Sequence, residues 1–237
     1  MVEPFKFKQF TIQQDRCAMK VGTDGVLLGA ATTLKNQPNS ILDIGSGTGL
    51  IALMLAQRSE AETIDAIELD ENAFEQCVEN FEASEWSDRL FCYHAPFQAF
   101  YGEMDETYDL IVSNPPFFKE RVTSGDNARD HARQNHALPF SELFKGVKNL
   151  LHSEGVFSMI TPFDSEEHVL ALAKTFGLFP FERLHVKGSP DVPVKRSIIQ
   201  FGFNRTVVAT QELTIETQRH RYTPAYIDLT KDFYLKM

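Results

Sequence analysis

The sequence has no apolar run near the ~20 residues that a membrane-spanning helix needs. Its first ten residues mix charged and aromatic side chains and lack the apolar segment of a signal peptide. The three cysteines, Cys17, Cys77 and Cys92, are odd in number and widely spaced, so they predict neither a disulfide framework nor a metal site. Repeats and long Pro/Gly linkers are absent. We therefore expect one domain over residues 1–237 in a reducing, cytoplasmic setting.

Positive charge is scarce in the first half of the chain. Residues 1–118 carry 7 Lys or Arg against 19 Asp or Glu, whereas residues 119–205 carry 12 against 10. The net charge of −10 argues against a nucleic-acid partner when taken alone, but the locally basic second half leaves one possible.

Short apolar, β-branched runs alternate with segments of helical periodicity. The predicted strands are residues 40–44, 63–69, 89–94, 108–113, 156–161, 183–187 and 197–204, and the predicted helices are 50–59, 71–83, 141–152 and 165–176. This alternation predicts an α/β, Rossmann-like fold, with a mostly parallel seven-stranded sheet covered by helices on both faces. The last two strands lack a helix between them and predict an antiparallel hairpin at the sheet edge.

A glycine-rich turn follows the first predicted strand. Gly45, Gly47 and Gly49 allow the backbone to pass close to a ligand, and a helix begins directly after them. The spacing is G-x-G-x-G with Asp43 two residues ahead, unlike the G-x-G-x-x-G of dinucleotide-binding proteins. It resembles motif I of the class I methyltransferases, which implies S-adenosylmethionine as the cofactor, with Asp43 holding the loop amides or the methionine ammonium through water.

The next two strand ends complete the expected cofactor site. Glu68 lies about 20 residues after the glycines, where a carboxylate accepts hydrogen bonds from both ribose hydroxyls. Leu69 is expected to pack on the adenine, and Asp70 to begin or cap the following helix. Class I methyltransferases often place an Asp after the third strand; this chain has none, so backbone groups of Ala95, with Phe97 stacking nearby, are the expected substitutes.

The fourth strand runs into Asn114-Pro115-Pro116-Phe117. The lone pair of a base amine is delocalised into the ring, so the amine is a poor nucleophile. The Asn114 side-chain oxygen and the Pro115 carbonyl can accept its two N–H groups and turn the lone pair toward a sulfonium methyl group. Pro116 stiffens the turn, and Phe117 offers a ring for the base. The pattern predicts methylation of a planar amino nitrogen, mainly by alignment.

The segment from Met19 to Gly29, the Asn114–Phe117 motif and the ending from Asp232 to Met237 together resemble the bacterial tRNA1(Val) adenine N6-methyltransferases over nearly the whole chain. The resemblance implies methylation of adenine 37 of a tRNA. It also implies that residues 1–38 contain a lid, with Lys20, Thr23 and Asp24 over the methionine end of the cofactor.

Such a substrate needs cationic contacts. Candidates for tRNA phosphates are Arg121, Arg129, Arg133, Lys187, Lys195 and Arg196, with His131 and His136 as further residues of the polar loop 117–138. The late cluster from Arg219 to Tyr222 is a weaker candidate. Three alternatives remain open: methylation of a guanine amine in rRNA, methylation of a protein glutamine amide, and RNA binding without catalysis.

Overall fold

The computed structural model describes residues 2–116 and 138–237. Its strands are β1 (Phe5–Lys6), β2 (Thr11–Ile12), β3 (Ser40–Ile44), β4 (Thr63–Glu68), β5 (Leu90–His94), β6 (Tyr108–Ser113), β7 (Leu151–Pro162), β8 (Phe179–Lys187), β9 (Arg196–Gly202), β10 (Ala209–Thr214), β11 (Glu216–Gln218) and β12 (Arg221–Tyr222). Its helices are α1 (Thr23–Ala31), α2 (Leu50–Arg58), α3 (Glu71–Glu82), α4 (Phe97–Glu103), α6 (Phe140–Leu150), the 3₁₀ turn η1 (Phe163–Ser165), α7 (Glu166–Thr175) and α8 (Pro224–Thr230).

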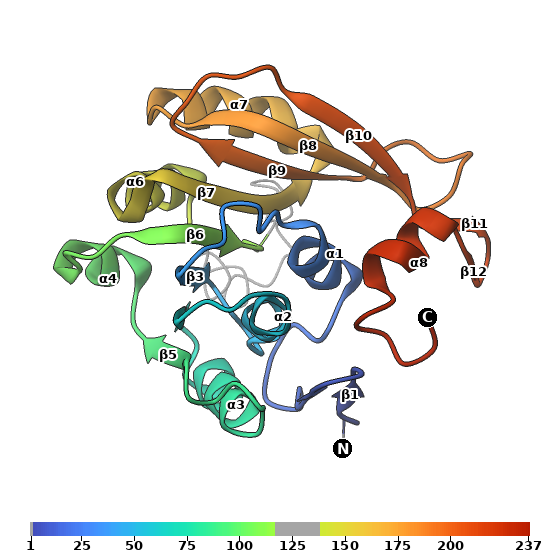
Figure 1. Ribbon diagram of the computed structural model, residues 1–237, viewed down its shortest axis with the longest axis horizontal. Coiled ribbons are helices and arrows are strands. Elements are labelled where there is room, and N and C mark those ends of the chain that lie inside the picture. Colours follow the sequence, from blue (N-terminus) through green and yellow to red (C-terminus); the bar gives the residue numbers. More distant parts are fainter. Residues whose placement is uncertain (1, 117–137) are drawn as a thin grey trace, which may run out of the picture.

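The main sheet has the strand order β10-β8-β9-β7-β6-β3-β4-β5 (Figure 1). Every strand in it is parallel to its neighbours except β9, which runs antiparallel to both β7 and β8. The carboxyl ends of seven strands and the start of β9 therefore share one edge, named the carboxyl edge below. In parallel α/β sheets this edge is where ligands bind.

All seven predicted strands are present, and so is the antiparallel β8–β9 pair. The predicted count of seven is one too low, because β10 adds to β8 in parallel and covers the edge assigned to the hairpin. Within β10 only Leu213 is buried. A strand with one buried residue carries little apolar patterning, which is why the sequence did not predict it.

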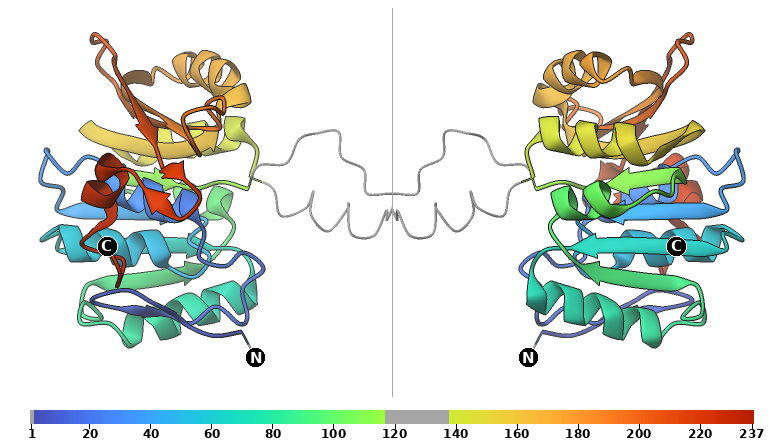
Figure 2. Two further views of the ribbon diagram at one scale, coloured as in Figure 1. Left: turned by 90° about the vertical axis from the view of Figure 1, so that its right-hand side faces the viewer. Right: turned by 90° about the vertical axis from the view of Figure 1, so that its left-hand side faces the viewer.

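Two hydrophobic layers enclose the sheet. Side chains of α1, α2, α3 and α8 pack with one face, and those of α4, α6 and α7 with the other. Figure 2 places the N-terminal segment and α3 at one end of the sheet and α7, β8 and β10 at the other. The four predicted helices are confirmed as α2, α3, α6 and α7, within two residues at each end.

Helix α1 is buried from Gly25 to Ala30. A Cβ on Gly29 would lie 2.7 Å from Met54 Sδ, so this glycine lets α1 approach α2 closely. The close packing fixes the beginning of α1, where Asp24 lies, against the carboxyl edge. Within the described ranges, no helix is long and apolar enough to cross a membrane.

Candidate active site

Two loops leave the carboxyl edge at the same level. Ile44 of β3 and Ser113 of β6 are register partners, and the Ser113 hydroxyl donates a 2.9 Å hydrogen bond to the Ile44 carbonyl. Gly45 and Asn114 are the next residues on these adjacent strands, which lie about 4.8 Å apart in a sheet. The glycine loop and the Asn-Pro-Pro motif therefore begin side by side.

The glycine loop needs its glycines for two different reasons. Gly45, Gly47 and Gly49 have φ values of 73°, 56° and 78°, in the left-handed region that other residues seldom adopt. A Cβ on Gly45 or Gly47 would meet nothing within 4 Å, whereas one on Gly49 would lie 2.5 Å from the Phe81 ring. Gly49 therefore serves packing on α3, and the other two leave open space where a cofactor can approach.

Asp43 lies beneath this loop and is fully buried. Neither of its carboxyl oxygens has a hydrogen-bond partner within the described ranges. Burial raises its pKa to about 7; the nearby Ala52 amide, which does not reach hydrogen-bond geometry, partly opposes the rise, and the Glu68 charge adds to it. A buried polar group without a partner is costly and indicates a missing ligand or water. This fits the role expected for Asp43 toward the cofactor.

Glu68 joins the glycine loop to the end of β4. Its Oε2 accepts the Gly47 amide at 2.8 Å, and its Oε1 accepts the amides of Leu69 and Asp70 at 2.8 and 2.9 Å. The carboxylate is thereby held at the open side of the loop, where ribose hydroxyls are expected. Leu69 is 39% exposed, as a surface for adenine requires. Asp70 caps α3 through the Ala73 amide at 2.9 Å, as predicted.

The end of β5 brings one correction. Phe97 is 5% exposed and packs edge-on against Tyr101, with α6 close enough that a Cβ on Gly146 would lie 2.3 Å from its ring. Phe97 is therefore a core residue and offers no stacking face, because α4, which was not predicted, turns it inward. Ala95 donates its N–H to the Glu68 carbonyl at 3.2 Å, which leaves its own carbonyl as the group for an adenine amine.

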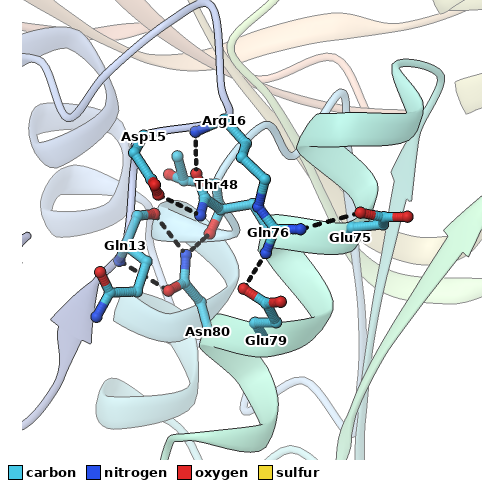
Figure 3. Close-up of polar contacts among 8 residues, drawn as sticks. All are labelled: Gln13, Asp15, Arg16, Thr48, Glu75, Gln76, Glu79 and Asn80. Atoms are coloured by element: carbon cyan, nitrogen blue, oxygen red, sulfur yellow. Dashed lines mark hydrogen bonds and ion pairs between the residues drawn. The ribbon is translucent and has the colours of Figure 1, made fainter. Parts of the chain in front are cut away.

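The N-terminal segment is fixed to α3, beside the glycine loop (Figure 3). The buried side chain of Asn80 accepts the Gln13 amide at 2.8 Å and donates to the carbonyls of Gln13 and Thr48 at 3.0 and 2.9 Å. One turn earlier, buried Gln76 accepts the Arg16 amide at 2.8 Å and donates to Asp15 at 3.0 Å. Thr48 belongs to the glycine loop, so Asn80 joins that loop to the chain leading to the lid.

Gln76 and Asn80 were not among the predicted site residues. Both are polar, four residues apart, and almost fully buried on the inner side of α3. Polar residues at helical spacing on the apolar face of a helix are the signal that indicates them. Arg16 adds ion pairs to Glu75 at 2.9 Å and to Glu79 on the exposed side of the same helix.

The expected lid residues lie at the start of α1. Lys20 and Thr23 are exposed, and the half-buried Asp24 accepts a 2.8 Å hydrogen bond from Arg196 Nε at the start of β9. Arg196 was predicted as an RNA contact. A residue assigned to the cofactor and one assigned to the RNA thus form an ion pair at the carboxyl edge.

The remaining predicted residues are the Asn-Pro-Pro motif, two lysines and a set that lies outside the described ranges. Asn114 and Pro116 are half-buried and Pro115 is buried at the end of β6. Lys195 is exposed between β8 and β9, and Lys187 pairs with Glu212 at 2.9 Å. The residues that lie outside the described ranges are Phe117, Arg121, Arg129, His131, Arg133 and His136.

The weaker RNA candidates also reach this edge. Thr214 at the end of β10 is paired with Lys187, and the β11–β12 hairpin follows directly. Arg219, His220, Arg221 and Tyr222 are all exposed on that hairpin.

Solved structures share this fold. A predicted O-methyltransferase from Agrobacterium tumefaciens superimposes with a TM-score of 0.67 at 20% identity, over 89% of this chain and 96% of that one. A putative RNA methyltransferase from Pyrococcus horikoshii gives 0.52 at 16% identity, over 75% and 79%. At these identities the likeness establishes a methyltransferase-type fold and nothing finer.

Sequence relatives carry the assignment further. Residues 22–179 match the model of the Methyltransferase small domain. Three relatives carry the name tRNA1(Val) (adenine(37)-N6)-methyltransferase. The protein from Christiangramia forsetii is 56% identical over 99% of both chains, and the one from Flavobacterium johnsoniae is 55% identical over 98% of this chain and all of its own. The one from Bacteroides fragilis is 45% identical over the whole of both chains. The chain belongs to the tRNA1(Val) (adenine(37)-N6)-methyltransferase family.

Proposed function

We propose that this chain transfers the methyl group of S-adenosylmethionine to the N6 amine of adenine 37 in tRNA1(Val), and that Asn114 holds the amine. The observation that carries the proposal is the pairing of Ile44 with Ser113, which sets Asn114 beside the glycine loop. The named relatives favour this acceptor over a guanine amine of rRNA or a protein glutamine amide.

The residues at the carboxyl edge fit the cofactor. Open space above Gly45 and Gly47 admits it, the Glu68 carboxylate meets its ribose, Leu69 packs on its adenine, and the unpartnered Asp43 lies beneath. Lys20, Thr23 and Asp24 cover its methionine end. When bound, the cofactor supplies an electrophilic methyl group on a sulfonium ion.

The chain's own contribution is alignment. The Asn114 side-chain oxygen and the Pro115 carbonyl accept the two N–H groups of the adenine amine, so its lone pair points along the line of transfer. Phe117, expected to stack on the base, lies outside the described ranges. No buried general base is required, because the methylated amine would be cationic and acidic and would release its extra proton to solvent after the new bond forms. Alignment of this kind lowers the barrier by holding the reacting atoms in near-attack geometry.

The tRNA is expected to lie along the carboxyl edge. We expect Lys187, Lys195 and Arg196 to contact its phosphates there; Arg121, Arg129 and Arg133, the other candidate contacts, lie outside the described ranges. Phosphate contacts fix the register of the RNA without reading its sequence.

The chain acts as one domain over residues 1–237 and works in the cytoplasm, where its substrate is.

The test is transfer of labelled methyl from S-adenosylmethionine to total tRNA from a strain lacking this protein, followed by nucleoside analysis. We expect label in N6-methyladenosine. Label in another nucleoside, or label on protein with unlabelled tRNA, would refute the proposed acceptor.

A further inference from the structure

An exposed phenylalanine stands at the carboxyl edge where β7 ends. Phe163 follows Pro162, the last residue of β7, and is 37% exposed. Among the phenylalanines of the described ranges, Phe91 on the outermost strand β5 is also notably exposed, at 45%. A single exposed apolar residue is common on protein surfaces, so the inference depends on the location of this ring at the ligand-binding edge and on the contacts that fix it.

Phe163 is held in place by a buried polar cluster. Its ring meets His185 edge-on, with centroids 5.0 Å apart. His185 Nε2 contacts Glu166 Oε2 at 2.9 Å, and Glu166, only 5% exposed, also pairs with Arg183 at 3.0 Å and accepts the Ser197 hydroxyl. The Phe163 amide donates to the Lys195 carbonyl at 3.1 Å. The ring is therefore preorganised, which lowers the entropy lost when a ligand contacts it.

The position of Phe163 relates it to the acceptor site. Met159 of β7 is the register partner of Ser113, and Asn114 follows Ser113. By this register Asn114 is level with Ile160, and Phe163 lies three residues further along the chain. Three residues span about 10 Å at the rise of a β-strand. This separation places Phe163 beside the acceptor base and too far away to contact that base itself.

Cationic residues stand at the ends of the strands beside Phe163, with Arg196 paired to Asp24 and Lys187 to Glu212. Pro162 is the register partner of Arg196, and the exposed Lys195 lies directly before it. Lys187 ends the neighbouring strand β8. An aromatic face combined with cations that track a phosphate backbone is the arrangement that binds single-stranded nucleic acid, since every base has a face that can stack.

We propose that Phe163 is a stacking platform for an unpaired base next to the target adenine, with Lys195 and Arg196 at the adjoining phosphates. The inference rests on the proposed placement of the acceptor at Asn114. By this inference the contacts of Glu166 with His185, Arg183 and Ser197 position a substrate-binding ring. Phe163 then joins the residues that determine tRNA affinity.

The variants Phe163→Leu, Phe163→Trp and Phe91→Leu test it by kinetics. Phe163→Leu keeps an apolar side chain without a ring, and we expect it to raise the KM for tRNA about tenfold. Its kcat and its Kd for S-adenosylmethionine should stay within twofold of wild type. Phe163→Trp should restore the KM, and Phe91→Leu should match wild type. Equal KM values for the two leucine variants would overturn the proposal.

Fluorescence gives a second measurement that does not depend on turnover. Trp86 is the only tryptophan, so Phe163→Trp in a Trp86→Phe background carries a single reporter. Stacking predicts quenching when an anticodon stem-loop is added. If Trp86→Phe fails to fold, Phe163→Trp is made in the wild-type background. Its change in emission on adding RNA is then compared with that of wild type, which reports Trp86 alone. Unchanged emission at saturating RNA would contradict stacking.

Asn114→Ala separates this inference from the function itself. That variant should lose turnover and retain the quenching at position 163. Wild-type turnover in Asn114→Ala would refute the acceptor placement. If Asn114→Ala is inactive and Phe163→Leu has the wild-type KM for tRNA, the proposed stacking role of Phe163 is refuted and the proposed function stands.

Discussion

Arg196 Nε donates a 2.8 Å hydrogen bond to Asp24 Oδ2, although 172 residues separate them in the chain. Asp24, one of the expected lid residues, lies in the first turn of α1, and Arg196 begins the antiparallel strand β9. The pair therefore connects the proposed cofactor side of the carboxyl edge with the proposed RNA side. Both side chains are partly exposed, so the direct energy is modest, about 0.2–1 kcal/mol.

The first prediction concerns this connection. Arg196→Ala should weaken the binding of S-adenosylmethionine two- to fivefold without RNA present, because Asp24 loses the group that orients it. Lys195→Ala removes the neighbouring cation, whose side chain does not contact Asp24, and should leave that affinity unchanged. Calorimetric titration measures both. Equal effects of the two substitutions would show that the affinity depends on positive charge in this region and not on the hydrogen bond between Arg196 and Asp24.

The second prediction concerns Asn80. Asn80→Asp keeps the acceptor for the Gln13 amide and loses both donors, so the Thr48 carbonyl of the glycine loop faces a carboxylate. Gln76→Glu makes the same chemical change on α3, at a residue that does not contact the loop. A buried hydrogen-bond loss costs roughly 1–3 kcal/mol. We expect about a tenfold rise in the Kd for S-adenosylmethionine with Asn80→Asp only.

The kinetic constants distinguish positioning from general destabilisation. At saturating cofactor, Asn80→Asp should recover most of the wild-type kcat, and its melting temperature should resemble that of Gln76→Glu. A matching rise in Kd for both variants would mean that α3 anchors the N-terminal segment without setting the glycine loop.

The third prediction concerns the pH dependence of stability through Asp43. Its pKa is raised from 3.8 to about 7 by burial. Between these values the unfolded carboxyl is ionised while the folded one retains its proton, so the unfolded state binds fewer protons and stability falls as pH rises. The fall begins near pH 4 and levels off above pH 7.

Urea unfolding of wild type and Asp43→Asn between pH 4.5 and 8 isolates this contribution. The free energy of unfolding of wild type, relative to the variant, should decline by a few kcal/mol up to pH 7, at about 1.4 kcal/mol per pKa unit. Asp105→Asn, at an exposed carboxyl, serves as the control with no such trend. A difference that grows with pH would contradict the buried-acid account.

The fourth prediction concerns the acceptor site. Asn114→Ala removes the side-chain oxygen that holds the amine, and kcat should fall on the order of 10²–10³, as for loss of one preorganised hydrogen-bonding group. Affinity for S-adenosylmethionine should be nearly unchanged, because the proposed role of this side chain is to hold the substrate amine. Single-turnover methyl transfer and calorimetry measure the two quantities. Wild-type turnover would exclude the proposed mechanism.

The sequence predicted the parts of the fold whose residues are buried on a regular period. The strands β3, β4 and β6 are buried along most of their length, mainly by apolar residues, and the glycine loop follows directly from its local spacing. The strand β10 escaped prediction because it is mostly exposed. Phe97 was misplaced because the short helix α4, which turns its ring into the core, has no clear periodic signal.

The contacts that organise the site depend on tertiary structure. Asn80 binds Gln13 across 67 residues, and Arg196 binds Asp24 across 172. No local pattern in the sequence specifies such partners, since they meet only when the sheet brings its carboxyl ends together. The sequence therefore predicted the chemical groups of the candidate site, and the structure shows the contacts that position them.

The most direct test of the central claim uses transcripts of tRNA1(Val) with adenine or guanine at position 37, incubated with this protein and labelled S-adenosylmethionine. The account predicts stoichiometric label in the adenine transcript, recovered as N6-methyladenosine at position 37, and none in the guanine transcript. Equal labelling of both transcripts, or label at another position, would contradict it.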